Sequence, residues 1–376
     1  MGKNERNGEN TYQKAIQIIK EAWSGYSFIF VFILILCIYI LVLSSRGYTF
    51  NWEYFSTILS SSTCATVGII ALGMSLVIIT GQFDLSVGSM TALTGAIGVL
   101  VYNSSNGNLL LTMAASILSG AFFGAINGVL SGKAKMPPFV VTLGNMLVFR
   151  SIAEYYVFNL PVEMTGSSYK YQISNKFQSY EITKTIGSGR LNIGSIGIPY
   201  MAIVFAVLVV IMVYVSRNTK YGKKVYAVGS NAKAAHLAGI NVDGIKVSVF
   251  IITGILVGIA SQLLVWKNTS VTPGSTATSY EMYAIAAVVL GGIAMSGGKG
   301  KVLGVFFGAL SYAAIDKIIS ASGLDVYIQG AAQGLVLILV VLIQTLGPII
   351  SERIATHRRI VLSEKMEKEV LEKAEA

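Results

Sequence analysis

Ten long apolar runs dominate this sequence of 376 residues. They lie at residues 26–44, 57–80, 86–102, 109–131, 138–158, 198–216, 246–266, 281–296, 303–320 and 326–346. About 20 apolar residues suffice for a helix to cross the hydrocarbon core of a membrane. The runs are continuous rather than alternating in polarity, which excludes a membrane β-barrel. The sequence therefore predicts an all-α, polytopic bundle of about ten membrane helices (8–10), with half-helices or re-entrant segments among the shorter runs.

Composition and charge support a membrane protein and give its orientation. The chain is 53% hydrophobic and 12% charged, whereas soluble domains are near ~25% charged. With the N terminus in the cytoplasm and ten spans, 20 lysines and arginines fall on the cytoplasmic side and 6 on the outside. This bias predicts that both termini are cytoplasmic. The net charge of +10 is therefore a topology signal that needs no nucleic acid, although anionic lipid can attract the basic ends.

The runs divide the chain into a membrane domain at 26–346, a polar N-terminal segment at 1–25 and a charged tail at 347–376. Residues 1–25 predict a short amphipathic helix on the cytoplasmic face and no cleavable signal peptide. Two long polar loops interrupt the membrane domain, an external one at 159–197 and a cytoplasmic one at 217–245. Cys37 and Cys64 lie inside apolar runs, which argues against a structural disulfide, and only two histidines leave no histidine-rich metal site.

The stretch "VLGGIAMSGGKGK" at 289–301 resembles a phosphate-binding loop but lacks its required residues. Such a loop needs G-x-x-x-x-G-K followed by serine or threonine. Gly292 and Gly297 have the spacing, but Gly298 stands where the lysine should be, and Lys299 is followed by Gly300. We therefore expect a tight turn at the cytoplasmic surface, in which glycines permit the backbone geometry. The helix-break glycines predicted here are Gly291, Gly292, Gly297 and Gly298.

A second break, "ITGQFDLSVGSM" at 79–90, contains Asp84 between two apolar runs. Gly81 and Gly88 are the helix-break glycines expected in it. Capping by Asp84 or Ser86 of a helix that begins at Val87 explains the polar residues and the glycine break together. An ionisable residue within a membrane is also a candidate for the transport path, and that alternative stays open.

Other polar residues in the apolar runs could line a path or bridge helices. Arg150 and Glu154 are four residues apart on one helix face and can pair, and a structural pair and a path-lining role are equally compatible with the sequence. The remaining candidates are Asn127, Asn145, Gln262 and Gln329. Glycines spaced by four, at 120, 124 and 128, at 254 and 258, and at 304 and 308, predict closely packed helices.

Four stretches in order along the chain carry a resemblance to a known family. They are "GQFDLSVGSMTALTGA", "MPPFVVTLGNM", "YGKKVYAVGSNAKAAHLAGINV" and "YEMYAIAAVVLGGIAMSGGKGKVLGVFFGAL". Together they resemble the inner-membrane permease subunits of bacterial ABC importers for monosaccharides, of the ribose and galactose type. The resemblance implies a transport subunit in the cytoplasmic membrane, without an enzymatic site and without a cofactor of its own.

The resemblance also implies partners. ATP and Mg²⁺ would bind a separate ATP-binding cassette ATPase, an extracytoplasmic binding protein would deliver the sugar, and a second permease subunit would complete the path as a homodimer or heterodimer. The loop at 217–245 is similar to the family's ATPase-docking loop. The docking candidates are Ser230, Asn231, Ala234, Ala235, His236 and Gly239. Ser230 or Asn231 can cap a short helix that Gly239 can end, although a plain connector would have the same local features.

Two departures and several alternatives accompany this resemblance. Tyr283 stands where many relatives have an acidic residue, and the external loop is longer than expected. Autoinducer-2, nucleosides and branched-chain amino acids are alternative substrates of related permeases. An ion-coupled secondary transporter, with Asp84 beside a broken helix, is a further alternative. A membrane-embedded enzyme ranks last, because the sequence has no catalytic constellation.

Overall fold

The computed structural model describes residues 27–166, 168–194, 196–325 and 328–336, together with residues 338, 339, 342, 346 and 356. The amphipathic helix expected within 1–25 and nearly all of the tail at 347–376 lie outside these residues. The chain separates into two units, Met1–Asp325 and Val326–Ala376. Of the second unit, the structure describes a helix at 328–336, which falls in the run at 326–346. All that follows concerns the first unit unless stated.

Six helices in the described part of the chain are long and apolar enough to cross a membrane. They are Ser27–Ser45, Ser62–Ile79 (α3), Leu109–Lys133, Tyr200–Asn218 (α9), Val242–Asn268 (α12) and Val302–Ala321 (α14). The helix at Leu109–Lys133 consists of α5, Leu109–Gly128, and the short π-helix η1, Val129–Lys133, that continues it. The runs at 86–102 and 138–158 form the less apolar helices α4, Val87–Ser104, and α6, Pro138–Phe158. The prediction of an all-α fold with several membrane-length helices is confirmed, but a total of about ten spans stays a prediction.

One run forms only half a span. The run at 281–296 yields α13, Tyr280–Leu290, which has 11 residues. At 1.5 Å per residue this helix is about 16 Å long, roughly half of the hydrocarbon thickness. The chain between α12 and α13, residues 269–279, has no helical structure. This agrees with the expectation that some of the shorter runs are half-helices.

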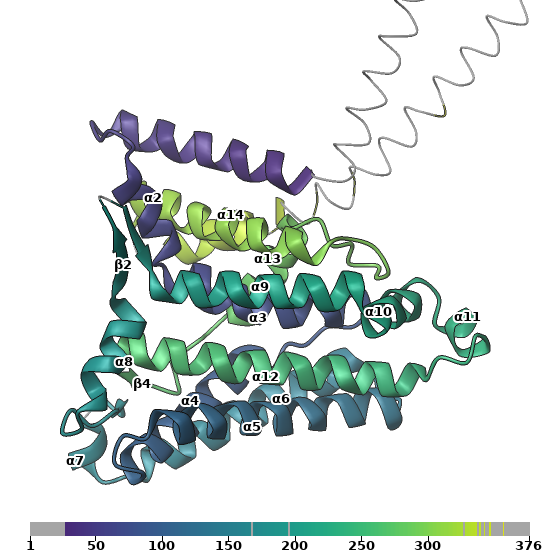
Figure 1. The fold of residues 1–376 in the computed structure, drawn as a ribbon, viewed down its shortest axis with the longest axis horizontal. Helices are drawn as coiled ribbons and strands as arrows, with labels where there is room; N and C mark the ends of the chain where they lie inside the picture. The colour runs from purple at the N-terminus through teal and green to yellow at the C-terminus, as the bar shows by residue number, and fades with distance from the viewer. Residues whose placement is uncertain are drawn as a thin grey trace, which may run out of the picture. The chain divides into compact units, whose positions relative to one another are not determined.

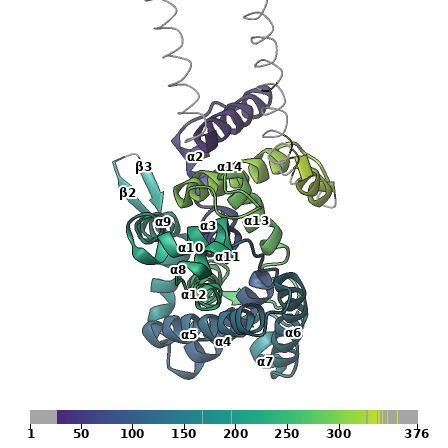
Figure 2. The same cartoon turned by 90° about the vertical axis from the view of Figure 1, so that its right-hand side faces the viewer.

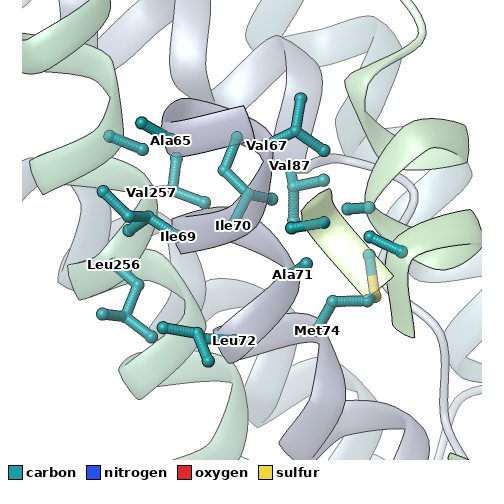
Figure 3. Packing of buried hydrophobic residues seen from close by; sticks show 14 of the residues in the cluster. Ala65, Val67, Ile69, Ile70, Ala71, Leu72, Met74, Val87, Leu256 and Val257 are labelled. Carbon is teal, nitrogen blue, oxygen red and sulfur yellow. The ribbon is translucent and has the colours of Figure 1, made fainter. Parts of the chain in front are cut away.

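Helix α3 is at the centre of the packing. All of its residues from Cys64 to Ile79 are buried, and a helix that is apolar on every side belongs in a core. Figure 3 shows Ile69 and Leu72 of α3 beside Leu256 and Val257 of α12. In both ribbon views α12 lies between α3 and α5 (Figures 1 and 2).

The glycine repeats pack helices against each other, as predicted. A Cβ atom added to Gly120 of α5 would lie 2.1 Å from the carbonyl oxygen of Gly254 in α12. One added to Gly304 of α14 would lie 1.9 Å from the carbonyl oxygen of Gly291 at the end of α13. Both distances are far below any real contact, so only glycine permits these helices to approach so closely.

The long loop at 159–197 forms short helices and strands of its own. It contains α7 (Val162–Thr165), β1 (Tyr171–Gln172), α8 (Ser179–Ser188), β2 (Arg190–Ile193) and β3 (Ile196–Pro199). Strand β2 pairs with β3, and β1 pairs with β4 (Ser270–Val271), both antiparallel. A loop of this length has many backbone polar groups to satisfy, and short strand pairs satisfy some of them.

The two loop regions lie at opposite ends of the bundle. Figure 1 shows α2 (Trp52–Leu59), α7, α8 and β2 at one end of the long helices. Helices α10 (Lys220–Ser230) and α11 (Ala232–Leu237) lie at the other end. This separation is the one expected if the loop at 159–197 is external and the loop at 217–245 is cytoplasmic.

Candidate functional site

Asp84 lies in the break between α3 and α4 and is completely buried. The break opens at Gly81, whose φ of +77° is a left-handed conformation that favours glycine. The Oδ1 atom of Asp84 accepts hydrogen bonds from the Ser86 backbone N–H at 2.9 Å and from the Ser86 hydroxyl at 2.6 Å. Ser86 holds the N-cap position of α4, but its side chain makes no hydrogen bond to the helix amides. Asp84 therefore fixes the turn that starts the helix rather than capping its first turn directly.

Two asparagines from other helices join Asp84. The Nδ2 atom of Asn127, in α5, donates to the Ser86 hydroxyl at 2.7 Å and lies 3.3 Å from Asp84 Oδ2. The Nδ2 atom of Asn145, in α6, donates to Asn127 Oδ1 at 2.6 Å. Asp84, from the break, and two asparagines from separate runs are thus brought into one buried network, which joins the break to α5 and α6. Ser86 is the member that was predicted only as an alternative cap.

Arg150 does not pair with Glu154. Its Nη1 atom donates to the carbonyl oxygens of Pro273 and, at 2.7 Å, of Thr276, and no ion pair joins it to Glu154 in the described part of the chain. The predicted helix-face pair is therefore not formed, because backbone carbonyls of the irregular segment before α13 take the guanidinium instead. Sequence spacing alone could not show this contact, since more than 120 residues separate the partners.

Gly88 belongs to the first turn of α4 and not to the break. A Cβ atom there would lie 2.4 Å from Oε2 of Glu281 and 2.6 Å from the carbonyl oxygen of Ala277. Its role is therefore close approach rather than unusual backbone conformation. Glu281, in the first turn of α13, is 8% exposed. This buried carboxyl group was not predicted, although its position at the start of an apolar run was a usable signal.

The glycine-rich stretch at 291–301 packs directly on the end of α3. Gly292, Gly297 and Gly298 have φ values of +77°, +83° and +70°, whereas Gly291 is the ordinary C-cap of α13. The N–H of Gly298 donates to the carbonyl oxygen of Ile79 at 2.8 Å. The predicted tight turn is therefore present, and it is joined to the break that leads to Asp84.

The end of α10 packs against both the end of α3 and the glycine-rich stretch. A Cβ atom on Gly229 would lie 1.7 Å from the Ile79 carbonyl oxygen and 2.8 Å from the Gly298 nitrogen. The Tyr226 hydroxyl, also on α10, donates to the carbonyl oxygen of Gly300 at 2.9 Å. We call the set Ile79, Gly229 and Gly298 the glycine junction. It connects the loop at 217–245 to both breaks through backbone contact.

The short helix expected in the cytoplasmic loop is α11. Asn231 caps it by accepting from the Ala234 N–H at 3.0 Å, and Gly239 follows it with a φ of +79°. Ser230, Asn231, Ala234, His236 and Gly239 are partly or largely exposed. Ala235 is only 5% exposed, so it packs within the chain and is not available to a partner. Leu237, which was not predicted, is 87% exposed.

The two glutamine candidates lie apart from these clusters. Gln262 of α12 is completely buried, and neither its Nε2 nor its Oε1 atom has a hydrogen-bond partner in the described residues. A Cβ atom on Gly98 of α4 would fall 1.8 Å from Nε2 of Gln262, so glycine makes room for the amide. Gln329 lies in the helix at 328–336 of the second unit.

Comparison with known proteins agrees with a membrane permease. A family model described as "Branched-chain amino acid transport system / permease component" matches residues 56–341. The ribose import permease protein of Escherichia coli (strain K12) is 34% identical over 81% of this chain and 88% of its own length. The ribose import permease protein of Bacillus subtilis (strain 168) is 34% identical over 73% and 80%. The xylose transport system permease protein of Haemophilus influenzae is 32% identical over 74% and 85%. No solved structure matches.

Proposed function

This chain belongs to the family of permease components of branched-chain amino acid transport systems, and we propose that it translocates a monosaccharide into the cytoplasm as a subunit of an ABC importer. The observation that carries the proposal is the 34% identity to a ribose import permease over 81% of the chain. The xylose permease among its relatives points to the same class of cargo. A pentose or hexose is therefore the cargo we expect.

The chain acts without a nucleotide site of its own. ATP and Mg²⁺ bind to a separate ATPase subunit, which docks on α11 and on the end of α10. Leu237 is 87% exposed and is the large apolar side chain that α11 offers to such a partner. Exposed Lys233, on α11, suits an acidic rim on that partner.

Motion reaches the membrane through the glycine junction. When the ATPase dimer closes, α11 and α10 move together, and the contact of Gly229 with Ile79 and Gly298 transmits the shift to both breaks. The end of α3 leads within five residues to Asp84, so the network of Asp84, Asn127 and Asn145 lies next to the moving element. The cargo crosses without covalent chemistry, and its differential affinity for the two states contributes to each step.

The complete subunit has about ten spans with both termini in the cytoplasm. The basic residues of the loop at 217–245 support this orientation. An extracytoplasmic binding protein delivers the sugar to the opposite end, where the external loop and α8 lie (Figure 1). A second permease subunit, identical or related, completes the path, and membrane lipid surrounds the assembly.

Mild extraction of the tagged chain, followed by mass spectrometry and uptake assays, tests this function. We expect an ATPase with Walker motifs to co-purify, and cells that express the whole transporter to accumulate labelled D-ribose or D-xylose. Uptake of L-leucine instead of these sugars would show an amino acid permease, the cargo that the family description names. ATP-independent uptake by the purified chain under an ion gradient would show a secondary transporter and would give Asp84 a direct role in coupling.

A further inference from the structure

A polar cavity of about 440 Å³ lies where α12 ends and the irregular segment before α13 begins. This volume is within the range of roughly 300–1,000 Å³ that is usual for small-molecule sites. The walls include Asn268, Ser270, Thr272, Ser275 and Tyr280, with Lys170 from the external loop. The cavity lies toward the end of the bundle that carries the external loop.

The structure around the cavity holds its walls in place. Strand β1 of the external loop pairs with β4, which opposes Gln172 to Ser270, and the Ile173 N–H donates to the Thr269 carbonyl oxygen at 3.0 Å. On the other side, Arg150 holds the carbonyl oxygens of Pro273 and Thr276. The cavity is therefore built by a strand pair and a half-buried arginine rather than by a free loop.

Several polar groups in the wall are left available. The Thr276 hydroxyl is used within the wall, because it accepts from the Thr272 N–H at 2.9 Å. By contrast, the side chains of Asn268, Thr272 and Ser275 make no hydrogen bond to any described residue. A ligand that offers both donors and acceptors could bind all three, since hydroxyl and amide groups can act in both directions.

The cavity's chemistry separates two classes of cargo. None of the described residues that line it is acidic, and only Leu264 and Ala277 are apolar. A branched-chain amino acid would find no carboxylate for its ammonium group and little apolar surface for its side chain. A sugar would instead replace its lost hydration with hydroxyl and amide partners.

We propose that this cavity receives the sugar from the extracytoplasmic side and that Asn268, Thr272 and Ser275 select for hydroxyl-rich cargo. This inference rests on the function proposed above. It also assigns a role to the unusually long external loop, which supplies Lys170 and the strand that fixes the cavity's rim.

Uptake of labelled D-ribose tests the proposal in cells whose only copy of this chain carries Thr272→Val and Ser275→Ala. Each neutral hydrogen bond is worth roughly a fivefold change, so we expect a loss of about tenfold or more in initial uptake rate. The matched control carries Ser104→Ala and Thr185→Val, two exposed hydroxyls of the same end that do not line the cavity. The control should stay within about twofold of the wild type. Equal uptake by the cavity variant and the control would overturn the proposal.

Labelling provides a second measurement if the double variant is poorly inserted. With Cys37 and Cys64 replaced by alanine, Ser275→Cys should react with a membrane-impermeant maleimide added outside, and D-ribose with its binding protein should slow this reaction. Ser104→Cys should react at a rate that ribose does not change. Labelling of Ser275→Cys that is insensitive to ribose contradicts the proposal, even though wild-type import continues. If wild-type cells import neither ribose nor xylose, the result contradicts the proposed function and therefore also the cavity proposal that rests on it.

Discussion

At the scale of single residues, the buried network around Asp84 is compatible with both roles predicted for that residue, shaping the start of a helix and taking part in the transport path. Asp84 receives both the backbone N–H and the hydroxyl of Ser86, so it shapes the start of α4. Asn127 and Asn145 extend the same network into α5 and α6. A residue that sets local backbone geometry can therefore also sense relative movement of three helices.

The substitution Asp84→Asn tests which role dominates. Asparagine keeps an oxygen that can accept from the Ser86 N–H and hydroxyl, so we expect at least half of the wild-type uptake to remain. Asp84→Ala removes the acceptor, leaves buried donors unpaired, and should lower the stability of the protein by about 1–3 kcal/mol. Thermal unfolding in detergent and sugar uptake measure the two effects. Complete loss of uptake by a normally stable Asp84→Asn protein would assign a path or gating role to the carboxylate.

Gly229→Ala tests the glycine junction. The new methyl group would meet the backbone of Ile79 and Gly298, and backbone atoms cannot move aside as a flexible side chain can. We expect at least a tenfold loss of uptake with the protein still in the membrane. Gly144→Ala is the matched control, because a Cβ atom there meets nothing within 4 Å and alanine favours the helix by about 1 kcal/mol. Equal uptake by the two variants would exclude transmission through this contact.

At the scale of elements, α11 presents a different surface from the one that its sequence suggested. The small residues of "NAKAAHLAG" predicted a docking face that included Ala235. The fold buries Ala235, whose carbonyl oxygen accepts from the Ile240 N–H at 3.0 Å, and turns Leu237 outward. Helical periodicity gives the separation of two faces, but the neighbouring elements decide which of them packs inward.

Leu237→Lys should therefore weaken binding of the ATPase. Burial of a leucine contributes about 1.5–3 kcal/mol, which corresponds to roughly 10–100-fold in affinity. Lysine in the last turn of α11 is compatible with the helix dipole, so the free helix should be preserved. Recovery of the ATPase with the tagged chain measures the effect. Leu110→Lys, at an 84% exposed leucine of α5, should retain the ATPase, and retention by Leu237→Lys as well would remove α11 as the docking element.

At the scale of the whole molecule, orientation and loop placement agree. The basic loop with α10 and α11 lies at one end of the long helices, and the external loop with α8 and β2 lies at the other (Figure 1). The distribution of lysine and arginine along the sequence predicts that the first end is cytoplasmic. Both proposals, ATPase docking at α11 and sugar entry near β4, require this orientation.

Cysteine labelling tests the orientation directly. In a chain with alanine at positions 37 and 64, Lys170→Cys should react with an impermeant maleimide in intact cells. Lys233→Cys should react only after the membrane is permeabilised. Both lysines are exposed in the structure, so a lack of reaction reports sidedness rather than burial. The opposite pattern would invert the topology and contradict both proposals.

The sequence by itself determined the kind of molecule, the two breaks and the helix-packing glycines. Apolar length, charge bias and glycine spacing are local properties, and the membrane restricts what such runs can form. It also indicated Asp84, Asn127 and Asn145 as polar candidates. It could not indicate that they meet, because one comes from a break and the other two from different runs.

Only the tertiary structure decided which partners these residues have. Arg150 donates hydrogen bonds to carbonyl oxygens of the 273–276 segment rather than pairing with Glu154 on its own helix. Gly88 allows the close approach of Glu281. The cavity that includes Lys170, Asn268 and Thr272 exists only because β1 meets β4 across about 100 residues of chain. Local pattern specifies where helices begin and end, whereas contacts between distant segments depend on how the helices pack, and those contacts make the sites.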